Sequence, residues 1–362
     1  VPRLDYSDGG CPSLLLEPSS TNLVTYSNDF SNSSWSKQSS STISTNTVIS
    51  PDGTLNASTF KASSNSGGVV LSTNITKTAF IKYSFSFYVK KSNHRYIGLS
   101  MGTASTSGSY NFYDFDTDTI NNTIVSPQSA PITRELIGNG WVKLTQVFEM
   151  EDSAFFNSLT KFAMTNSSGS TTYTPSGTEE VYVYGAQLEQ KSYPTSYIPT
   201  SGSAVTRVAE TANGAGDAAT FNDSEGVLYA EISALANDLS FRLITLSDGT
   251  TNDRISFGYR STSNAIYCEI RNANVTQAFL LGTLADIKNL SKVAIKYKEN
   301  DFALWINGIE AATDNSGITP LNLSRLNFDS GQQTGGFFYG NVKDLRVYNT
   351  ALTDSELQAL TK

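Results

Sequence analysis

Alternation of apolar and polar residues is the clearest pattern along this chain. In residues 82–90 the larger apolar side chains stand at every second position, as Tyr83, Phe85, Phe87 and Val89. A period of two places them on one face of an extended segment, so the pattern predicts a strand with one buried face. Residues 141–148 and 180–188 repeat the pattern and predict two further strands.

The second half of the chain continues the pattern and then ends differently. Short runs rich in β-branched and aromatic residues occupy residues 226–232, 292–297 and 302–306. Asn307-Gly308 follows the last run, and both residues tolerate positive φ, so we expect a tight hairpin turn there. Thr353 with Glu356 three residues later predicts a capping box, which would open a short helix that runs to Leu360.

The segments between the strands determine the predicted fold class. Ser/Asn/Gly-rich stretches such as residues 63–68 are typical of turns, and helical periodicity is absent between the strands. Residues 193–203 carry two prolines, which favour a domain boundary, while their Tyr and Ile side chains favour an ordered strap. We therefore predict an all-β protein with two antiparallel β-sandwich (jelly-roll) domains in tandem, residues 1–203 and 204–362, and a short C-terminal helix.

Composition narrows the classes of partner. The chain has 362 residues, enough for two sandwiches, and only 16% are charged. The formal net charge is −8, and Lys and Arg form no stripe, so a nucleic-acid partner is not expected. No apolar run reaches the length of a membrane span, so membrane insertion is not expected. The chain opens at Val1 without an initiator Met, and we expect it to be part of a longer protein.

Residues with catalytic chemistry are scarce. The sequence has one histidine, His94, in a turn-like segment that predicts an exposed side chain. Cys11 and Cys268 are far apart, and we expect them in different domains, so neither a disulfide framework, a zinc site nor a nucleophile–histidine pair is predicted. The nearest carboxylate clusters are residues 149–152 and 179–180, both at strand ends where charges are normally solvated. We therefore expect no enzyme, although a glycoside hydrolase or polysaccharide lyase stays an alternative.

One acidic segment is open to two interpretations. Asp114, Asp116 and Asp118 stand at alternate positions, close to the spacing of calcium loops. The segment lacks the glycine and the distal Glu of an EF-hand. It therefore predicts either a structural calcium site or an acidic hairpin turn, and no other cofactor is expected.

Aromatic residues beside loops are the candidates for ligand contact, because aromatic rings match the apolar faces of sugar rings. The candidates are Tyr96, Tyr110, Tyr113, Tyr173, Tyr259 and Tyr339. For the pair Tyr110 and Tyr113, strand alternation predicts that at least one ring points outward. Packing in the core, with the hydroxyl at the rim, is the alternative for each of them. We expect the three tryptophans, Trp35, Trp141 and Trp305, in the core.

Three stretches of the second predicted domain carry a resemblance. Residues 293–297, 304–308 and 340–357 resemble the later strands and closing helix of concanavalin A-like, laminin-G-type domains. The resemblance implies a β-sandwich. It does not fix a function, because that fold hosts lectins, hydrolases and adhesion modules alike.

The first predicted domain carries a second resemblance. Its stretches are residues 11–18 with 21–30 and Trp35, residues 139–143, and residues 184–189 with 193–200 and 204–207. They resemble the carbohydrate-binding-module-like jelly rolls of phage tail and other structural proteins. The resemblance implies a virion or prophage protein. Related modules often hold a structural calcium ion, to which Asp29 would contribute here, although Tyr184 stands where an acidic residue is common.

These observations predict a non-catalytic module that binds carbohydrate or a cell surface, located on a virion or outside the cell. The expected partners are a polysaccharide or cell-surface glycan and other virion proteins. One alternative is a purely structural virion appendage that binds no sugar. The other alternative is a polysaccharide-degrading enzyme or its accessory domains. The sequence does not distinguish the binding module from the structural appendage, because the two share every feature described above.

Overall fold

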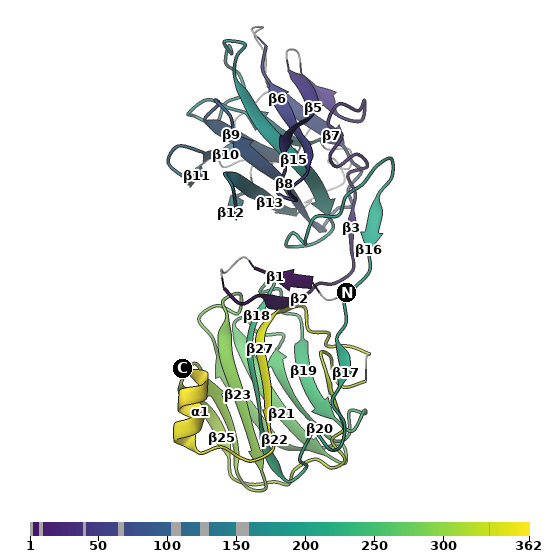
Figure 1. Cartoon of the computed structure of the whole chain (residues 1–362), viewed down its shortest axis with the longest axis vertical. Coiled ribbons are helices and arrows are strands. Elements are labelled where there is room, and N and C mark those ends of the chain that lie inside the picture. The colour runs from purple at the N-terminus through teal and green to yellow at the C-terminus, as the bar shows by residue number, and fades with distance from the viewer. Residues whose placement is uncertain are drawn as a thin grey trace. The chain divides into compact units, whose positions relative to one another are not determined.

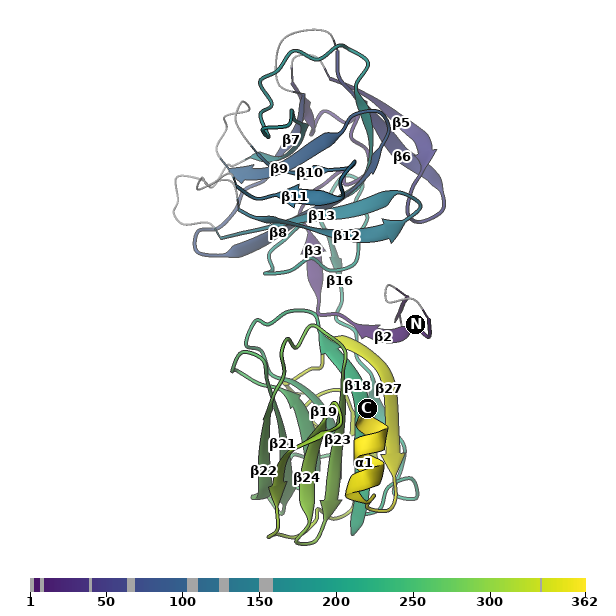
Figure 2. The ribbon, with the colours of Figure 1, turned by 90° about the vertical axis from the view of Figure 1, so that its left-hand side faces the viewer.

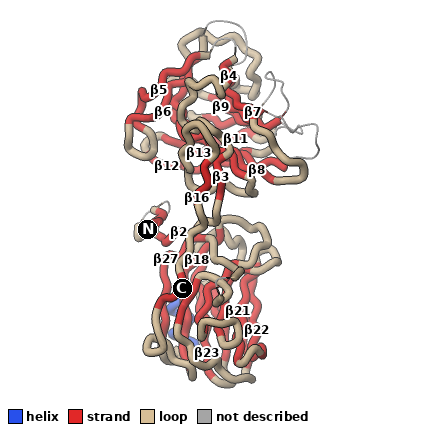
Figure 3. Tube along the Cα trace, turned by 90° about the vertical axis from the view of Figure 1, so that its right-hand side faces the viewer, coloured by secondary structure: helices blue, strands red, loops and turns tan. Residues whose placement is uncertain are grey.

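The computed structural model describes residues 3–6, 10–38, 41–63, 69–102, 110–123, 130–149, 159–332 and 334–362. These residues form antiparallel strands and, at the C-terminal end, one short helix (Figure 3). The predicted all-β class is confirmed. The chain divides into two compact units, which we call the first unit (residues 19–208) and the second unit (residues 1–18 together with 209–362).

The N-terminal segment belongs to the second unit, so its predicted place in a domain of residues 1–203 was wrong. Strand β1 (Arg3–Asp5) pairs with β2 (Ser13–Leu16). Strand β2 in turn pairs with β27 (Gly340–Tyr348) near the other end of the chain (Figure 1). The Arg3 guanidinium forms ion pairs with the carboxylates of Glu17 and Glu210. The segment is therefore an integral edge of the second sandwich.

The first unit is a sandwich of two six-stranded sheets. One sheet has the order β11 (Thr119–Asn121), β10 (Asn111–Asp114), β9 (Tyr96–Gly102), β14 (Leu159–Met164), β7 (Val70–Asn74) and β4 (Ser36–Lys37). The other has the order β12 (Ile132–Gly138), β13 (Trp141–Glu149), β8 (Lys82–Lys91), β15 (Glu180–Glu189), β6 (Leu55–Lys61) and β5 (Thr42–Ile49). The predicted strands at 82–90, 141–148 and 180–188 are thus confirmed as β8, β13 and β15.

The core of the first unit lies between its two sheets. Phe85 and Phe87 of β8 point inward, as the alternation predicts. The Phe162 ring of β14 stacks on Phe87 with centroids 4.5 Å apart, and Phe30, Trp35 and Phe60 lie around it. Burial of these apolar side chains is the main favourable contribution to the folding of this unit.

The Pro-containing strap of residues 193–203 is ordered and lies on the first unit. The Ile198 amide donates to the Gln187 side chain at 2.6 Å, and the Thr200 amide donates to the Ser27 hydroxyl at 2.8 Å. A two-stranded ribbon of β3 (Ser20–Asn22) and β16 (Val205–Arg207) follows the strap. The predicted ordered strap is confirmed, and the turn predicted at residues 63–68 lies largely outside the described residues.

The second unit is also a sandwich. Its seven-stranded sheet has the order β1, β2, β27, β18 (Glu225–Ala234), β23 (Ser291–Lys298), β24 (Phe302–Ile306) and β25 (Ile309–Asp314). Its six-stranded sheet has the order β17 (Asn213–Ala215), β26 (Arg325–Asn327), β19 (Arg242–Ser247), β20 (Arg254–Tyr259), β21 (Ala265–Asn272) and β22 (Val275–Thr283). Helix α1 (Asp354–Thr361) packs on the seven-stranded sheet through Leu357 (Figure 2).

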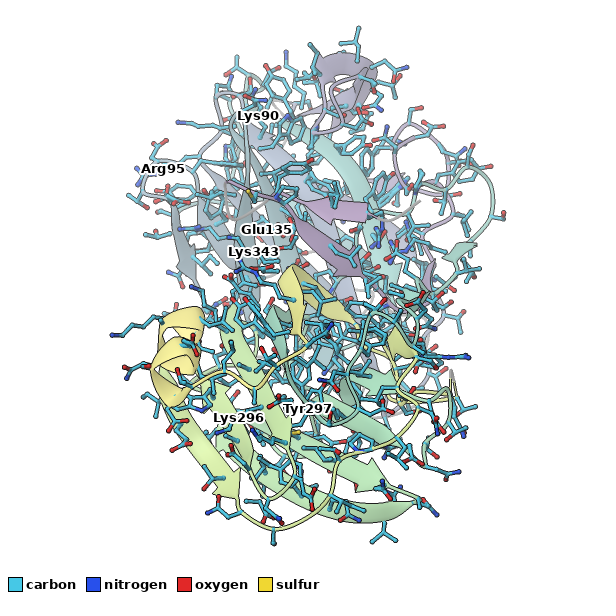
Figure 4. All side chains as sticks on the ribbon, turned by 60° about the horizontal axis from the view of Figure 1, so that its bottom comes forward. Lys90, Arg95, Glu135, Lys296, Tyr297 and Lys343 are labelled. Atoms are coloured by element: carbon cyan, nitrogen blue, oxygen red, sulfur yellow. The ribbon has the colours of Figure 1, made fainter. Side chains whose placement is uncertain are left out.

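Local features of the second unit follow the sequence. Lys296 and Tyr297 are consecutive residues of β23 (Figure 4): Tyr297 is fully buried, and the Lys296 ammonium reaches the Asp301 carboxylate at 2.6 Å. Asn307 and Gly308 have φ of 47° and 81° in the turn between β24 and β25, as predicted. The predicted capping box, with Thr353 as N-cap and Glu356 at N3, is present.

The N-terminal pairing gives a first prediction. Leu16 is 3% exposed and belongs to the core of the second unit. Leu16→Ala should lower the free energy of unfolding by about 2–5 kcal/mol, because it removes buried methyl groups and leaves a cavity. Chemical denaturation of the whole chain measures the effect. Leu4→Ala on β1, where Leu4 is 52% exposed, is the control with little expected effect; equal effects of the two variants would contradict the assignment of this segment to the core.

Candidate functional site

The strongest candidate site lies on the outward face of the six-stranded sheet of the second unit. Alternation along β21 directs Ile266, Cys268 and Ile270 into the core. Tyr267 and Glu269 therefore point to the other side of the sheet. Cross-strand pairing places Leu281 of β22 directly opposite Tyr267. Among the described strands, β22 is the edge strand of this sheet and is hydrogen-bonded only to β21 (Figure 2).

Three aromatic rings lie together on this face. The Tyr267 ring centroid is 5.5 Å from that of Phe279 and 6.1 Å from that of Phe241. Tyr267 is only 7% exposed, whereas Phe241, Phe279 and Leu281 are each about half exposed, at 47%, 46% and 47%. Burial raises the pKa of the Tyr267 hydroxyl to about 12, so the ring is neutral at physiological pH. We call these four residues with Arg260 the aromatic face.

Arg260 connects two of the rings. Its Cζ atom lies 5.8 Å from the Tyr267 centroid and 5.7 Å from the Phe279 centroid, within range of a cation–π interaction. Its Nε atom is buried and has no hydrogen-bond partner in the described structure. The guanidinium is therefore positioned by aromatic contacts, with donor capacity that the described residues leave unused.

The remaining charged side chains on this side of the sheet form a local network. The Glu269 carboxylate receives Arg254 Nη2 at 2.7 Å and lies 3.7 Å from Arg271 Nε. The Thr276 hydroxyl donates to the same carboxylate at 3.0 Å. Glu269 is thus engaged in a local network and is not placed as a free general base. The arrangement supports binding by stacking and hydrogen bonding.

Sequence reasoning missed most of this face, although a signal was present. In residues 275–283, alternation sends Ala278 and Leu280 inward, which leaves Phe279 and Leu281 at positions where a half-buried strand normally carries polar residues. Two large apolar side chains on the outward positions of one strand mark an exposed apolar face. Of the sequence candidates, Tyr259 is adjacent in the chain, but it points into the core.

Three of the predicted tyrosines are buried, so their predicted contact with a ligand was wrong. Tyr259 is fully buried in the core of the second unit, and Tyr110 and Tyr113 are 2% and 3% exposed in the first unit. The Tyr113 hydroxyl donates to Asp118 at 2.7 Å, and Tyr110 packs with Val70. Neither ring of the Tyr110 and Tyr113 pair is outward, because Tyr110 and all four residues of β10 are buried.

The other three tyrosines are half-buried. Tyr96 contacts Phe112 edge-on, and the Arg95 guanidinium lies over its ring. Tyr173 stacks on His94, and Tyr339 stacks on Phe337. These rings keep some solvent access, and they lie on separate segments of the chain. The three tryptophans are buried, as predicted, at 2–6% exposure.

The predicted calcium residues each face other partners. Asp114 receives Arg95 Nε and Nη2, both at 2.8 Å, and Asp116 pairs with Lys91. Asp118 pairs with Arg134 at 2.8 Å, on the turn between β10 and β11. The exposed Asp29 accepts from the amide and hydroxyl of Ser31. Within the described ranges, no three His, Cys, Asp or Glu side chains converge as metal ligands would.

The Arg95–Asp114 pair, with Arg95 labelled in Figure 4, gives a pH prediction. Hydrogen bonds from Arg95 hold the pKa of Asp114 well below its usual range. A carboxyl with a lowered folded-state pKa stabilises the fold above its unfolded pKa, about 3.9, and this contribution is lost as the pH falls through the folded value. Asp114→Asn should therefore lower the melting temperature at pH 7, and the difference from wild type should shrink below about pH 4. Thermal melts from pH 2 to pH 8 test this; a constant difference would contradict it.

The single histidine and the cysteines also depart from expectation. His94 is partly buried, its Nε2 lies 3.0 Å from the Thr165 carbonyl oxygen, and burial lowers its pKa, so the predicted exposed side chain was wrong. Cys11 and Cys268 are free thiols within the same unit rather than in different domains. Cys268 is buried, which raises its pKa and makes it unreactive.

Within the part of the chain that the structure describes, no helix has the length and apolarity needed to cross a bilayer.

Comparison with known families places this fold. Residues 217–358 match the family model described as the concanavalin A-like lectin/glucanases superfamily. The matched residues contain the whole aromatic face and most of the second unit. The sequence-based resemblance to concanavalin A-like, laminin-G-type domains is thereby confirmed. A comparison with curated proteins gives no match.

Solved structures provide further neighbours. The carbohydrate-binding module CBM40 of the Ruminococcus gnavus IT-sialidase is 18% identical, with 42% of this chain and 94% of that chain covered and a TM-score of 0.35. A heptameric pentraxin from Limulus polyphemus is 13% identical, with 41% and 74% covered and a TM-score of 0.33. Domains LG4-5 of the mouse laminin α1 chain are 10% identical, with 80% and 90% covered and a TM-score of 0.29.

Proposed function

We propose that this chain is a non-catalytic glycan-binding protein and that the aromatic face of the second unit holds the sugar. The observation that carries the proposal is the pair of half-exposed rings, Phe241 and Phe279, on either side of the buried Tyr267. Large rings are normally buried in a soluble protein, and a cluster that is held in solvent is a mark of a binding surface.

The chemistry of the face fits a saccharide. Aromatic rings pack against the C–H faces of sugar rings, while hydroxyl groups need hydrogen-bond partners at the edges. Arg260 supplies donors beside the rings, and Glu269, which accepts from the Thr276 hydroxyl, lies directly opposite Phe279 in the sheet. The match of residues 217–358 to a superfamily that includes lectins supports the proposal.

Affinity electrophoresis tests this function directly. The whole chain is run in native gels that contain neutral or acidic polysaccharides, beside a non-binding protein of similar charge. We expect the chain to be retarded by at least one polysaccharide. Equal mobility in every gel and in the polymer-free gel would contradict the proposal and would favour a structural appendage. Release of reducing ends or unsaturated products during the same incubations would instead revive the enzyme alternative.

We also propose that the chain is part of a phage or prophage virion and that it takes part in adsorption to the host cell. This rests on the sequence resemblance of residues 184–189 with 193–200 and 204–207. In this segment the Gln187 side chain donates to the Thr195 carbonyl oxygen, and the Glu189 carboxylate accepts from the Thr195 amide. Labelled chain should therefore bind intact cells of a bacterial strain in which the parent gene lies in a prophage region. Absence of binding to cells, together with retardation by a soluble polysaccharide, would leave the sugar function intact and remove the adsorption role.

A further inference from the structure

We propose that the aromatic face selects sugars that carry a carboxylate, and that Arg260 recognises this group. The inference rests on the proposed glycan-binding function and adds the chemical class of the ligand. Its carrying observation is a guanidinium that contacts two aromatic rings and has no acidic partner among the described residues.

Three other arginines of this sheet are paired with carboxylates. Arg242 donates to Asp238 at 2.7 Å, Arg254 donates to Glu269 at 2.7 Å, and Arg271 lies 3.7 Å from the same carboxylate. Arg260 differs from these three because, within the described residues, no carboxylate lies within ion-pair distance of it. Its buried Nε has no hydrogen-bond partner there, as is also true of theirs. A guanidinium always carries its charge and presents a planar fork that matches a carboxylate in two parallel hydrogen bonds.

The rings hold Arg260 in place before any ligand arrives. Its Cζ atom lies at nearly equal distances, 5.8 Å and 5.7 Å, from the Tyr267 and Phe279 centroids. These contacts restrict a flexible side chain, so less conformational entropy is lost when a ligand binds. A sugar ring that lies on the exposed Phe279 would bring a substituent at its edge to the guanidinium. A carboxylate at this place gains charge-assisted hydrogen bonds that a hydroxyl does not.

Local charge favours the same ligand class. Strands β20, β21 and β22, together with Arg260, carry three guanidinium groups, which are those of Arg254, Arg260 and Arg271. The same strands carry one carboxylate, that of Glu269. The net charge of these side chains is thus opposite in sign to that of the whole chain, which has a formal net charge of −8. An acidic saccharide is repelled by most of the surface and attracted here, and such complementarity gives orientation and specificity.

The test uses paired polymers in affinity electrophoresis. Polygalacturonate, alginate and hyaluronan are each compared with a carboxyl-reduced form, which keeps the backbone and loses the charge, alongside the neutral polymers used for the function itself. We expect retardation by at least one acidic polymer and roughly ten- to hundred-fold weaker binding of its reduced form, the range for losing charge-assisted hydrogen bonds. Added salt should weaken the acidic interaction.

Variants separate the two proposals. Arg260→Gln should abolish the preference for the acidic form and leave residual binding through the rings, and Arg260→Lys should restore part of the preference. Arg325→Gln, which removes an exposed guanidinium from the same sheet outside the aromatic face, should change neither. Thermal melts check that every variant is folded.

The outcomes are distinct. Equal retardation by acidic and reduced forms, retardation by neutral polymers only, or an unchanged preference in Arg260→Gln would overturn the acidic-sugar inference while glycan binding stands. Equal mobility in all gels would overturn the proposed function itself.

Discussion

Replacing Phe279 with alanine is expected to weaken glycan binding roughly ten-fold or more, as truncation of a central interface residue does. The Phe279 ring is 46% exposed, contacts Tyr267 and lies beside the Arg260 guanidinium. Its removal therefore takes away the stacking surface and one of the two contacts that fix Arg260. Because the ring is half exposed already, the fold should lose little stability.

Isothermal titration with an oligosaccharide of the most strongly retarding polymer measures this effect. Phe80→Ala is the matched control. Phe80 is 75% exposed and lies in the first unit, so this variant removes the same side chain outside the aromatic face. Full affinity in Phe279→Ala, or an equal loss in both variants, would remove the aromatic face as the binding site.

The largest expected effect on stability is at Phe162. This fully buried ring stacks on Phe87 at 4.5 Å and contacts Phe30, Trp35 and Phe60 at 5.7–5.9 Å. Phe162→Ala should lower the free energy of unfolding of the first unit by about 3–5 kcal/mol, through lost burial and a cavity among rings that cannot all collapse inward. That is a large fraction of the ~5–15 kcal/mol that holds a typical domain folded.

Denaturant unfolding followed by near-UV circular dichroism, which reports on packed aromatic residues, measures this loss. Phe80→Ala again serves as the control, and its effect should stay within about 0.5 kcal/mol, the usual range for surface positions. A loss below about 1 kcal/mol in Phe162→Ala would contradict the central position of this ring, because fully buried Phe truncations cost more.

The local elements were predictable because their signals are local. The alternation of Phe85 and Phe87 depends only on the period of a strand. The turn at Asn307-Gly308 depends on tolerance of positive φ, and the helix start at Thr353 depends on a cap formed within four residues. These features therefore appear in the structure within one or two residues of their predicted positions.

The membership of the N-terminal segment was not predictable in the same way. Leu14 pairs with Val342, more than three hundred residues later, and such pairing leaves no periodic signal in the sequence. A strand at the sheet edge obtains its partner from tertiary contacts alone. The resemblance placed residues 11–18 with the segment that follows them, whereas the Arg3, Glu17 and Glu210 ion pairs hold them to the second unit.

The candidate site was the least predictable part. Alternation divides the residues of a strand into two faces, but it does not tell which face is covered by other elements. Tyr110 and Tyr113 follow turn-rich sequence and are nevertheless buried, whereas Phe279 lies in an apolar run and is exposed. The unpaired state of Arg260 likewise depends on which carboxylates the fold brings near, and Glu269 is used by Arg254 and Arg271 instead.

The most direct test of glycan binding by the aromatic face is a crystal structure of the whole chain with a bound oligosaccharide from the most strongly retarding polymer. We expect a sugar ring stacked on Phe279, contact with Phe241, and a substituent of the sugar hydrogen-bonded to Arg260. An ordered oligosaccharide bound elsewhere on the chain, with Phe279 and Arg260 untouched, would contradict it.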